Sequence, residues 1–265
     1  MPATPTGLHC DVTELKAPWD TVRAPIVMHH GIGTNAAIWS GWLPVLAPHH
    51  RVVRFDTRGF GRSHGTWHAG TTMDELVGDL MQAVAQAGAP KVHLIGESLG
   101  GTVALAAALK HPERIASVII SNATHRGTGI GRVRGWREEI GRDGIAPWAE
   151  AMMTARFTDD SPISAAQRTW FARTQAASDP APIIQLGELL AGLDMSDAVR
   201  TLAMPLLILS PDGSPFIPAT MAAELKGLVP DAELMVFPGT RHGLPFSHAR
   251  ACAEAALQFL QRRFG

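Results

Sequence analysis

The sequence predicts an α/β fold with a mostly parallel central sheet, helices on both faces of the sheet and a helical cap insertion. Three observations lead to this fold class. Short apolar runs alternate with segments of helical pattern, one long stretch interrupts the alternation, and 265 residues suffice for one large domain with a substantial hydrophobic core. Strands and helices in alternation form parallel sheets that are covered on both faces.

Six apolar runs, each bounded by Gly, Pro or polar residues, are predicted to be buried strands. In chain order they occupy residues 26–29 (IVMH), 52–55 (VVRF), 92–95 (VHLI), 118–121 (VIIS), 206–209 (LLIL) and 234–237 (LMVF). Helices are predicted near residues 35–46, 72–88, 99–111, 217–228 and 248–263. Sheets of this kind bind ligands beyond the carboxyl ends of their strands, so catalytic residues are expected directly after a strand.

Residues 125–195 interrupt this alternation, because they contain no obvious buried strand and have the pattern of several short helices. We therefore predict a core domain formed by residues 1–124 and 196–265, and a helical cap formed by residues 125–195. The first part of the cap contains five arginines, Arg126, Arg132, Arg134, Arg137 and Arg142. These side chains could bind a substrate carboxylate, but a solvated helix face is the favoured interpretation.

The composition excludes several classes of protein. Hydrophobic residues make up 46% and charged residues 18% of the chain, which is typical of a compact globular protein. The formal net charge of -1 gives no reason to expect nucleic acid or an anionic membrane as a partner. Neither a signal peptide nor a stretch of roughly 20 apolar residues is visible, so we expect a cytoplasmic protein that does not enter a membrane. The oligomeric state stays open.

The segment Gly96-Glu97-Ser98-Leu99-Gly100 follows the third predicted strand and opens a predicted helix. It has the G-x-S-x-G pattern of a nucleophile elbow, in the strand–turn–helix setting that such an elbow requires. The serine backbone in this turn is strained, and glycines two residues before and after it let the turn close. The free N–H groups of the helix point at the same place. Ser98 is therefore the predicted nucleophile.

A serine hydroxyl is a poor nucleophile unless a base takes its proton. In the chain order Ser, Asp or Glu, His, the base lies near the C-terminus, and His242 follows the last predicted strand. The acid that orients the base should follow the preceding strand, where Asp212 is the only acid in the loop 210–218. We therefore predict His242 as the base and Asp212 as the acid.

Two further loops carry candidate residues. Ile32 lies in the loop after the first strand, which supplies an oxyanion-hole donor in this kind of site, and the backbone N–H groups of Ile32 and Leu99 are the predicted donors. Trp39, shortly after this loop, and Trp136 in the predicted cap are the predicted substrate-binding residues, although core packing explains both equally well. In the loop DTRGFGRS, Asp56 is predicted to be structural, together with its neighbour Arg58.

With these motifs the chain resembles the α/β-hydrolase superfamily across nearly its whole length. The segments HHGIG, DTRGFGRS, GESLGG and RHG occur in the expected order. Within the superfamily, the stretches GTNAAIW, ISNATHR, ARFTDD and MPLLILS are most similar to the 3-oxoadipate enol-lactonase-like branch. The resemblance implies the α/β-hydrolase fold and a serine hydrolase.

The loop of the predicted acid departs from this branch. Its members carry an Asp a few residues past the strand, and an ungapped comparison puts Ser214 at that position. Either the loop is rearranged so that Asp212 reaches His242, or the acid comes from elsewhere. The position after the fourth strand, which some members use, holds Ser121-Asn122. A triad with a weaker or absent acid also stays open, since the acid orients the base rather than reacting.

The expected activity is hydrolysis of a small-molecule carboxylic ester or lactone through an acyl-enzyme on Ser98, with no cofactor or metal. The same residues support two enzymatic alternatives, hydrolysis of a carbon–carbon bond and perhydrolysis. The alternative from another class is a ligand-binding protein without turnover, and the unusual acid loop keeps it open. The identity of the substrate does not follow from the sequence.

Overall fold

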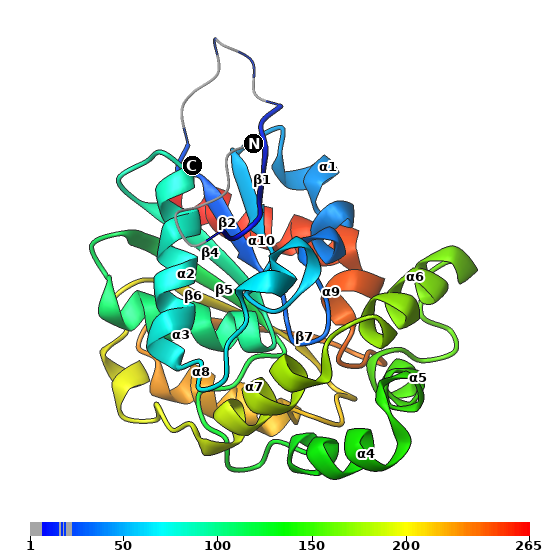
Figure 1. The fold of residues 1–265 in the computed structure, drawn as a ribbon. Coiled ribbons are helices and arrows are strands. Elements are labelled where there is room, and N and C mark those ends of the chain that lie inside the picture. The colour runs from blue at the N-terminus through cyan, green and yellow to red at the C-terminus, as the bar shows by residue number, and fades with distance from the viewer. Residues whose placement is uncertain (1–6, 16, 18, 20–22) are drawn as a thin grey trace.

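A seven-stranded sheet lies at the centre of the computed structural model, which describes residues 7–15, 17, 19 and 23–265 (Figure 1). Its strands are β1 (Cys10–Thr13), β2 (Ile26–His29), β3 (Val52–Phe55), β4 (Val92–Glu97), β5 (Ile115–Ser121), β6 (Leu206–Pro211) and β7 (Ala232–Phe237). Their order across the sheet is β1-β3-β2-β4-β5-β6-β7. β1 runs antiparallel to β3, and all other neighbours are parallel. The predicted mostly parallel sheet is confirmed.

All six predicted strands occur in this sheet. The prediction that all six are buried is wrong for β7, which lies at the edge of the sheet with Met235 and Val236 exposed. β2 and β3 have the predicted bounds, whereas β4, β5, β6 and β7 extend beyond them. The sequence analysis missed β1, whose segment CDVT has one buried residue, Cys10, and three half-buried ones. This short edge strand has no apolar run by which it could be predicted, because it is only half-buried. It forms by pairing with the free edge of β3.

Helices cover both faces of the sheet (Figure 1). Alternate residues of a strand face opposite sides: in β2, Val27 joins one cluster of buried side chains, while Ile26 and Met28 join the other. The first cluster includes residues of α2 (Met73–Gln86), α3 (Leu99–Lys110) and α8 (Ala219–Leu228), and the second includes residues of α1 (Leu43–Leu46) and α10 (Ala249–Phe264). Shorter elements in the connections are η1 (Ala36–Gly41), η2 (Gly61–Thr66), η4 (Ala198–Thr201) and α9 (Leu244–Ser247).

Between β5 and β6 the chain leaves the sheet and forms helices. These are η3 (Val133–Gly135), α4 (Trp136–Asp143), α5 (Ile145–Arg156), α6 (Ala165–Ala176) and α7 (Pro180–Gly192), of which α4, α5 and α6 form a green group along the lower and right side of Figure 1. The last residue of α5 joins this group to the loop after β7, because the Gly243 N–H donates to the Arg156 carbonyl over 2.8 Å. We propose to treat residues 125–195 as a cap on a core of residues 1–124 and 196–265.

The loop after β3 is held by buried charges. The Asp56 carboxylate accepts hydrogen bonds from the backbone N–H groups of Ala36 and Arg62, each over 2.8 Å. Arg58 donates two hydrogen bonds to Asp79 of α2, over 2.5 and 2.8 Å. The predicted structural role of Asp56 and Arg58 is therefore confirmed.

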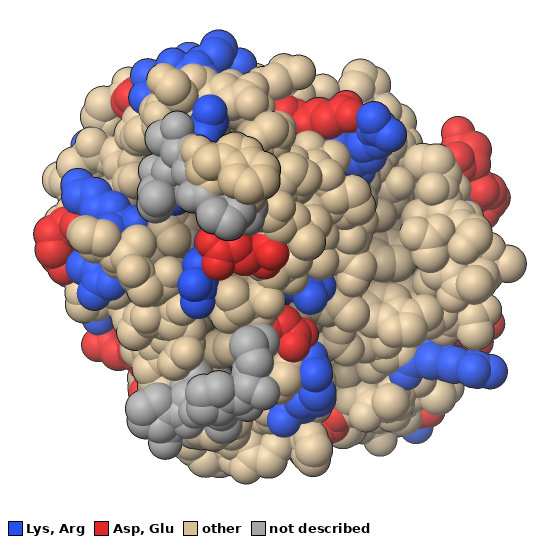
Figure 2. Space-filling model, turned by 90° about the horizontal axis from the view of Figure 1, so that it is seen from above, with Lys and Arg blue, Asp and Glu red and all other residues tan. Residues whose placement is uncertain are grey.

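On one face of the molecule the charged side chains of both signs are dispersed (Figure 2). On the face seen in Figure 2, lysines and arginines alternate with acidic side chains, and no large area carries a single sign. Within the described part of the chain, no helix combines the length and the apolar character that crossing a bilayer requires.

Buried His93 of β4 predicts a loss of stability in acid. Its Nδ1 lies 2.8 Å from the Ser117 hydroxyl, and its ring packs against His50 and Phe264. Burial and the neighbouring His50 lower the pKa of His93 from 6.5 to about 3. Between pH 6.5 and about pH 3 the His93 side chain binds a proton in the unfolded chain but not in the folded chain. The contribution of His93 to stability is therefore fully present above about pH 6.5 and is lost as the pH falls toward 3. The contribution of His93 should fall by about 2 kcal/mol between pH 7 and pH 5.

Urea unfolding of the wild type and of His93→Gln at both pH values isolates this contribution, because the other histidines are common to the two proteins. The difference in unfolding free energy between pH 7 and pH 5 should be smaller in the variant by about 2 kcal/mol. An equal difference in both proteins would show that His93 is protonated in the folded state.

Candidate active site

The turn between β4 and α3 places Ser98 at the carboxyl edge of the sheet. Its backbone has φ 55° and ψ −121°, and such left-handed geometry is strained for a residue with a side chain. A Cβ on Gly96 would lie 2.4 Å from the Gly100 carbonyl oxygen, and one on Gly100 would lie 2.1 Å from the His29 carbonyl oxygen. Only glycine fits at either position, because the start of α3 docks directly onto the ends of β4 and β2.

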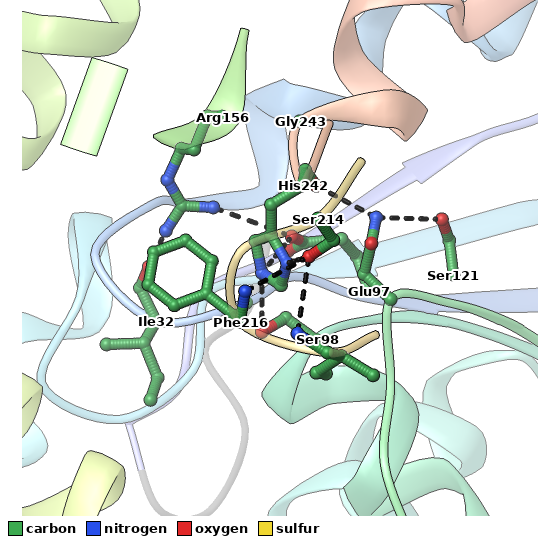
Figure 3. Close-up of polar contacts among 12 residues, drawn as sticks. Ile32, Glu97, Ser98, Ser121, Arg156, Ser214, Phe216, His242 and Gly243 are labelled. Atoms are coloured by element: carbon green, nitrogen blue, oxygen red, sulfur yellow. Dashed lines mark hydrogen bonds and ion pairs between the residues drawn. The ribbon is translucent and has the colours of Figure 1, made fainter. Parts of the chain in front are cut away.

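His242 reaches Ser98 from the loop after β7. Its Nε2 lies 3.2 Å from the Ser98 Oγ (Figure 3). The Asn122 side chain donates to the His242 carbonyl over 2.8 Å, and the Phe216 ring packs against the imidazole with 4.7 Å between centroids. Burial and, to a smaller extent, the positive charge of Arg156 lower the pKa of His242 well below 6.5. The imidazole is therefore neutral near pH 7, as a base that accepts the serine proton must be.

The structure does not bring Asp212 to His242. Asp212 is exposed at the turn after β6, and the group that faces the imidazole Nδ1 is the Ser214 hydroxyl, at 3.1 Å. The Gly213 N–H donates to the Thr240 carbonyl over 3.0 Å and so ties the two loops together one residue before Ser214. This tie selects Ser214 rather than Asp212 as the neighbour of His242, in agreement with the ungapped comparison.

Position 214 is surrounded by hydrogen-bond donors. The backbone N–H groups of Phe216 and Ile217 point at the Ser214 Oγ over 3.4 and 3.3 Å, and the His242 Nδ1 is a third neighbour. A hydroxyl oxygen has two lone pairs and no charge, whereas a carboxylate could accept from all three groups. The loop thus directs three hydrogen-bond donors at position 214, as a site for a carboxylate would, but the side chain at that position is the neutral Ser214.

Of the two residues predicted to supply oxyanion-hole donors, Ile32 lines the cavity that contains Ser98, and Leu99 directly follows Ser98 in the chain. Leu99 is the first residue of α3, so its N–H has no partner within the helix, and Ile32 lines the cavity beside Ser98. His30 holds the Ile32 loop: its Nε2 accepts from the Thr57 N–H over 2.9 Å, which leaves the proton on Nδ1 to be donated to the Gly31 carbonyl over 2.8 Å.

The cavity at Ser98 is small and mostly apolar. Its volume is about 20 Å³, and it is lined by Ile32, Ser98, Ile130, Val133, Trp136, Arg156, Leu190, Phe216, Ile217 and His242. That volume holds a single water molecule. A hollow of about 910 Å³ between the loop 59–61 and α6 includes neither Ser98 nor His242, so we place the chemistry in the small cavity.

The two predicted substrate-binding tryptophans lie in different places. Trp136, the first residue of α4, lines the small cavity and contacts Phe216. Trp39 does not line it: this side chain is fully buried and packs at 5.2 Å against Trp42 in the cluster formed with α10. The structure therefore corrects the prediction for Trp39, which is a core residue because η1 turns it toward the sheet.

Two charged residues of the site were missed by the sequence analysis. Glu97 and Arg156 are both buried, and the Glu97 Oε1 lies 3.7 Å from the His242 Nε2 and 3.7 Å from the Arg156 Nη1 (Figure 3). Arg156 also donates to the Ile32 carbonyl over 3.2 Å. Burial raises the pKa of Glu97 to about 7, against the lowering effects of Arg156 and the Gly31 amide. The sequence did contain a signal for Glu97, because this acidic residue lies between a run of apolar residues that forms a buried strand and one that forms a buried helix.

The five arginines at the start of the cap lie elsewhere. Three of them form ion pairs. Arg137 pairs with Glu188 and Arg142 with Asp143 at the surface, and Arg126 pairs with Glu224 in a partly buried position. None of the five lines the cavity at Ser98, whose described lining contains a single arginine, Arg156. The favoured interpretation as a solvated face agrees with this placement.

Comparison with known proteins assigns the family. Residues 24–249 match the family described as "alpha/beta hydrolase fold". The chain is 25% identical over 252 residues to "Putative carbamate hydrolase RutD" of Caulobacter sp. (strain K31), covering 90% of this chain and 91% of the relative. It is 29% identical over 241 residues to the pimeloyl-[acyl-carrier protein] methyl ester esterase of Aliivibrio fischeri, covering 84% and 88%.

Among solved structures, the enol-lactonase of Burkholderia xenovorans LB400 has the same fold, with a TM-score of 0.83, 22% identity and 96% of each chain covered. The chain belongs to the α/β-hydrolase fold family and is a hydrolase of that family. The predicted family and fold are confirmed, and an enol-lactonase is among the relatives in structure.

Proposed function

We propose that this protein hydrolyses a carboxylic ester or lactone through an acyl-enzyme on Ser98. The observation that carries the proposal is the 3.2 Å approach of the His242 Nε2 to the hydroxyl of a serine held in a strained strand-to-helix turn. The base and nucleophile are within hydrogen-bond reach, which is the arrangement that activates a serine.

In this mechanism the Ser98 Oγ attacks the carbonyl carbon while its proton passes to the His242 Nε2. The N–H groups of Ile32 and Leu99 bind the oxyanion of the tetrahedral intermediate. Its collapse expels the alcohol, which takes the proton from the imidazolium, and an acyl group remains on Ser98. Water then attacks the acyl-enzyme with His242 again as the base, and the acid is released.

Because the cavity at Ser98 holds only a single water molecule, its lining must move apart to admit a substrate. The apolar character of that lining supports a substrate with an apolar part next to the reacting carbonyl. Trp136, Phe216 and Leu190 would contact that part, and the buried Arg156 would lie near polar atoms of the substrate. A panel of esters, lactones and carbamates of increasing acyl length would identify the preferred class.

The first test of the function is labelling with a fluorophosphonate probe, followed by intact-protein mass spectrometry of the wild type and Ser98→Ala. We expect one adduct on the wild type and none on the variant, because only an activated serine attacks the phosphorus. A folded wild type that gains no adduct would favour a ligand-binding protein without turnover, and labelling of both proteins would place the nucleophile elsewhere.

Exchange of Asp212 for asparagine should change kcat/KM by less than about twofold, because its exposed carboxylate does not contact the base. The measurement is steady-state hydrolysis of a p-nitrophenyl ester by the wild type and Asp212→Asn. A triad acid that is replaced by its amide costs about 10⁴-fold in kcat, so a loss of that size would mean that the loop after β6 rearranges to bring Asp212 to His242.

A further inference from the structure

We propose that Glu97, the residue before the nucleophile, supplies the negative charge that the His242 imidazolium needs during catalysis, in place of a triad acid at position 214. This inference rests on the proposed function and concerns the same site. Glu97 acts through His242 and is a positioning residue, since it balances the charge of the base without contacting the substrate.

The need for such a charge follows from the surroundings of His242. When Ser98 attacks, its proton makes the imidazole a cation inside a buried cavity that already contains Arg156. In a serine triad, a carboxylate at Nδ1 stabilises that cation. Here Nδ1 faces the hydroxyl of Ser214, which carries no charge.

Glu97 is the one acidic residue, in the described part of the chain, with a carboxylate oxygen within 4.0 Å of a His242 ring nitrogen. Its distance of 3.7 Å from Nε2 is longer than a hydrogen bond, so the carboxylate does not hold the Nε2 proton. Nε2 stays available to Ser98, at 3.2 Å, and to the leaving group. Two charges at this separation in a buried site nevertheless interact strongly.

The groups that face Glu97 come from three elements, and two of them, Arg156 and His242, can carry a charge. Arg156, at the end of α5, lies 3.7 Å from the same carboxylate oxygen that faces His242, and the other oxygen lies against Gly31 in the loop after β2. His242 belongs to the loop after β7. The positive charge of Arg156 repels the imidazolium and stabilises the ionised carboxylate of Glu97. An ionised Glu97 therefore offsets the repulsion by Arg156 and attracts the imidazolium, since its Oε1 lies 3.7 Å from both groups.

The loop after β6 provides a way to test this role by moving the charge. The N–H groups of Phe216 and Ile217 already point at the side chain of Ser214. An aspartate at position 214 would accept from both groups and from the His242 Nδ1, as a triad acid does. If Glu97 supplies the missing charge, this second carboxylate should make Glu97 dispensable.

The experiment compares the wild type, Glu97→Gln, Ser214→Asp and the double variant in the hydrolysis of a p-nitrophenyl ester between pH 5 and pH 9. Glu97→Gln should lower kcat on the order of 10²-fold at pH 8 with KM changed by less than about threefold, since the charge matters when the imidazolium forms. The double variant should recover to within about tenfold of the wild type.

The pH profile separates this role from a structural one. Burial raises the pKa of Glu97 to about 7, so the wild-type kcat/KM should rise as the pH increases through about 7 and Glu97 ionises. This limb should be absent in Glu97→Gln. Glu224→Gln is the matched control, because it removes a carboxylate that is also paired with an arginine, Arg126, away from the cavity. Its rate and pH profile should equal those of the wild type.

Ser214→Asp alone is a second test, which leaves Glu97 and Arg156 in place. A carboxylate at Nδ1 that stays ionised at pH 6 should raise the rate at that pH above that of the wild type. The inference is overturned if Glu97→Gln keeps the wild-type rate and limb, if a folded Glu97→Gln is not rescued by Ser214→Asp, or if Ser214→Asp leaves the profile unchanged. A wild type that hydrolyses no substrate would overturn the proposed function itself.

Discussion

Exchange of Ser98 for alanine should reduce kcat for ester hydrolysis on the order of 10⁵-fold, and the further exchange of His242 for alanine should reduce it no more. The physical reason is that the two side chains act as one unit: the imidazole, 3.2 Å from the hydroxyl, has no proton to accept once that hydroxyl is gone. The residual rate should come from substrate binding and from the N–H groups of Ile32 and Leu99, which neither substitution removes.

The measurement is kcat for Ser98→Ala, His242→Ala and the double variant, each with circular dichroism and thermal unfolding to show that the protein is folded. Ser196→Ala is the control for the loss of a serine hydroxyl, because this residue lies outside the cavity and should leave kcat unchanged. Losses that multiply in the double variant would mean that Ser98 and His242 act independently, and the proposed proton transfer between them would be wrong.

Exchange of Gly100 for alanine should prevent the nucleophile turn from forming. The added Cβ would lie 2.1 Å from the His29 carbonyl oxygen and 2.7 Å from that of His30, and all three of its nearest contacts are backbone atoms. Backbone atoms cannot move aside as the end of a flexible side chain can, so α3 must separate from β2 and from the loop that holds Ile32. We expect a loss of stability of about 3 kcal/mol or more, and the loss of activity with it.

Gly78→Ala is the matched control for this prediction. Gly78 is an exposed residue inside α2, and a Cβ there would meet no atom within 4 Å. Alanine is the better helix former, so this variant should gain about 0.5–1 kcal/mol in the free energy of unfolding. Urea unfolding of the three proteins measures both effects. A Gly100→Ala variant as stable as Gly78→Ala would contradict the close docking of α3 onto β2.

The local sequence contains most of the fold and the first half of the site. Apolar runs flanked by turn residues predict β2 to β7. In β2 to β6 the run is apolar because the strand is buried on both faces, whereas the edge strand β7 has an apolar run that is half-buried or exposed. The elbow is equally local: Gly96, Ser98 and Gly100 are constrained by one another and by the strand and helix that they join. His242 follows from chain order alone.

The neighbours of His242 do not follow from local sequence. Asp212 and Ser214 lie in one loop, and both fit a position shortly after β6. The hydrogen bond between Gly213 and Thr240 decides between them. Two loops far apart in the chain must pack before that bond exists, so the composition of either loop leaves the choice open.

The contacts of the arginines in residues 125–195 are likewise not predictable from local sequence. Arg126 and Arg156 look alike in the sequence, yet one pairs with Glu224 away from the cavity and the other lies beside Glu97. By itself the sequence determined the order of strands and helices and the glycine-flanked turn at Ser98, because these depend on residues adjacent in the chain, and chain order predicted Ser98 and His242 as the proposed nucleophile and base. Only the tertiary structure decided which charges surround the base, because α5, the β4–α3 turn and the loop after β7 meet at one point through packing between distant segments.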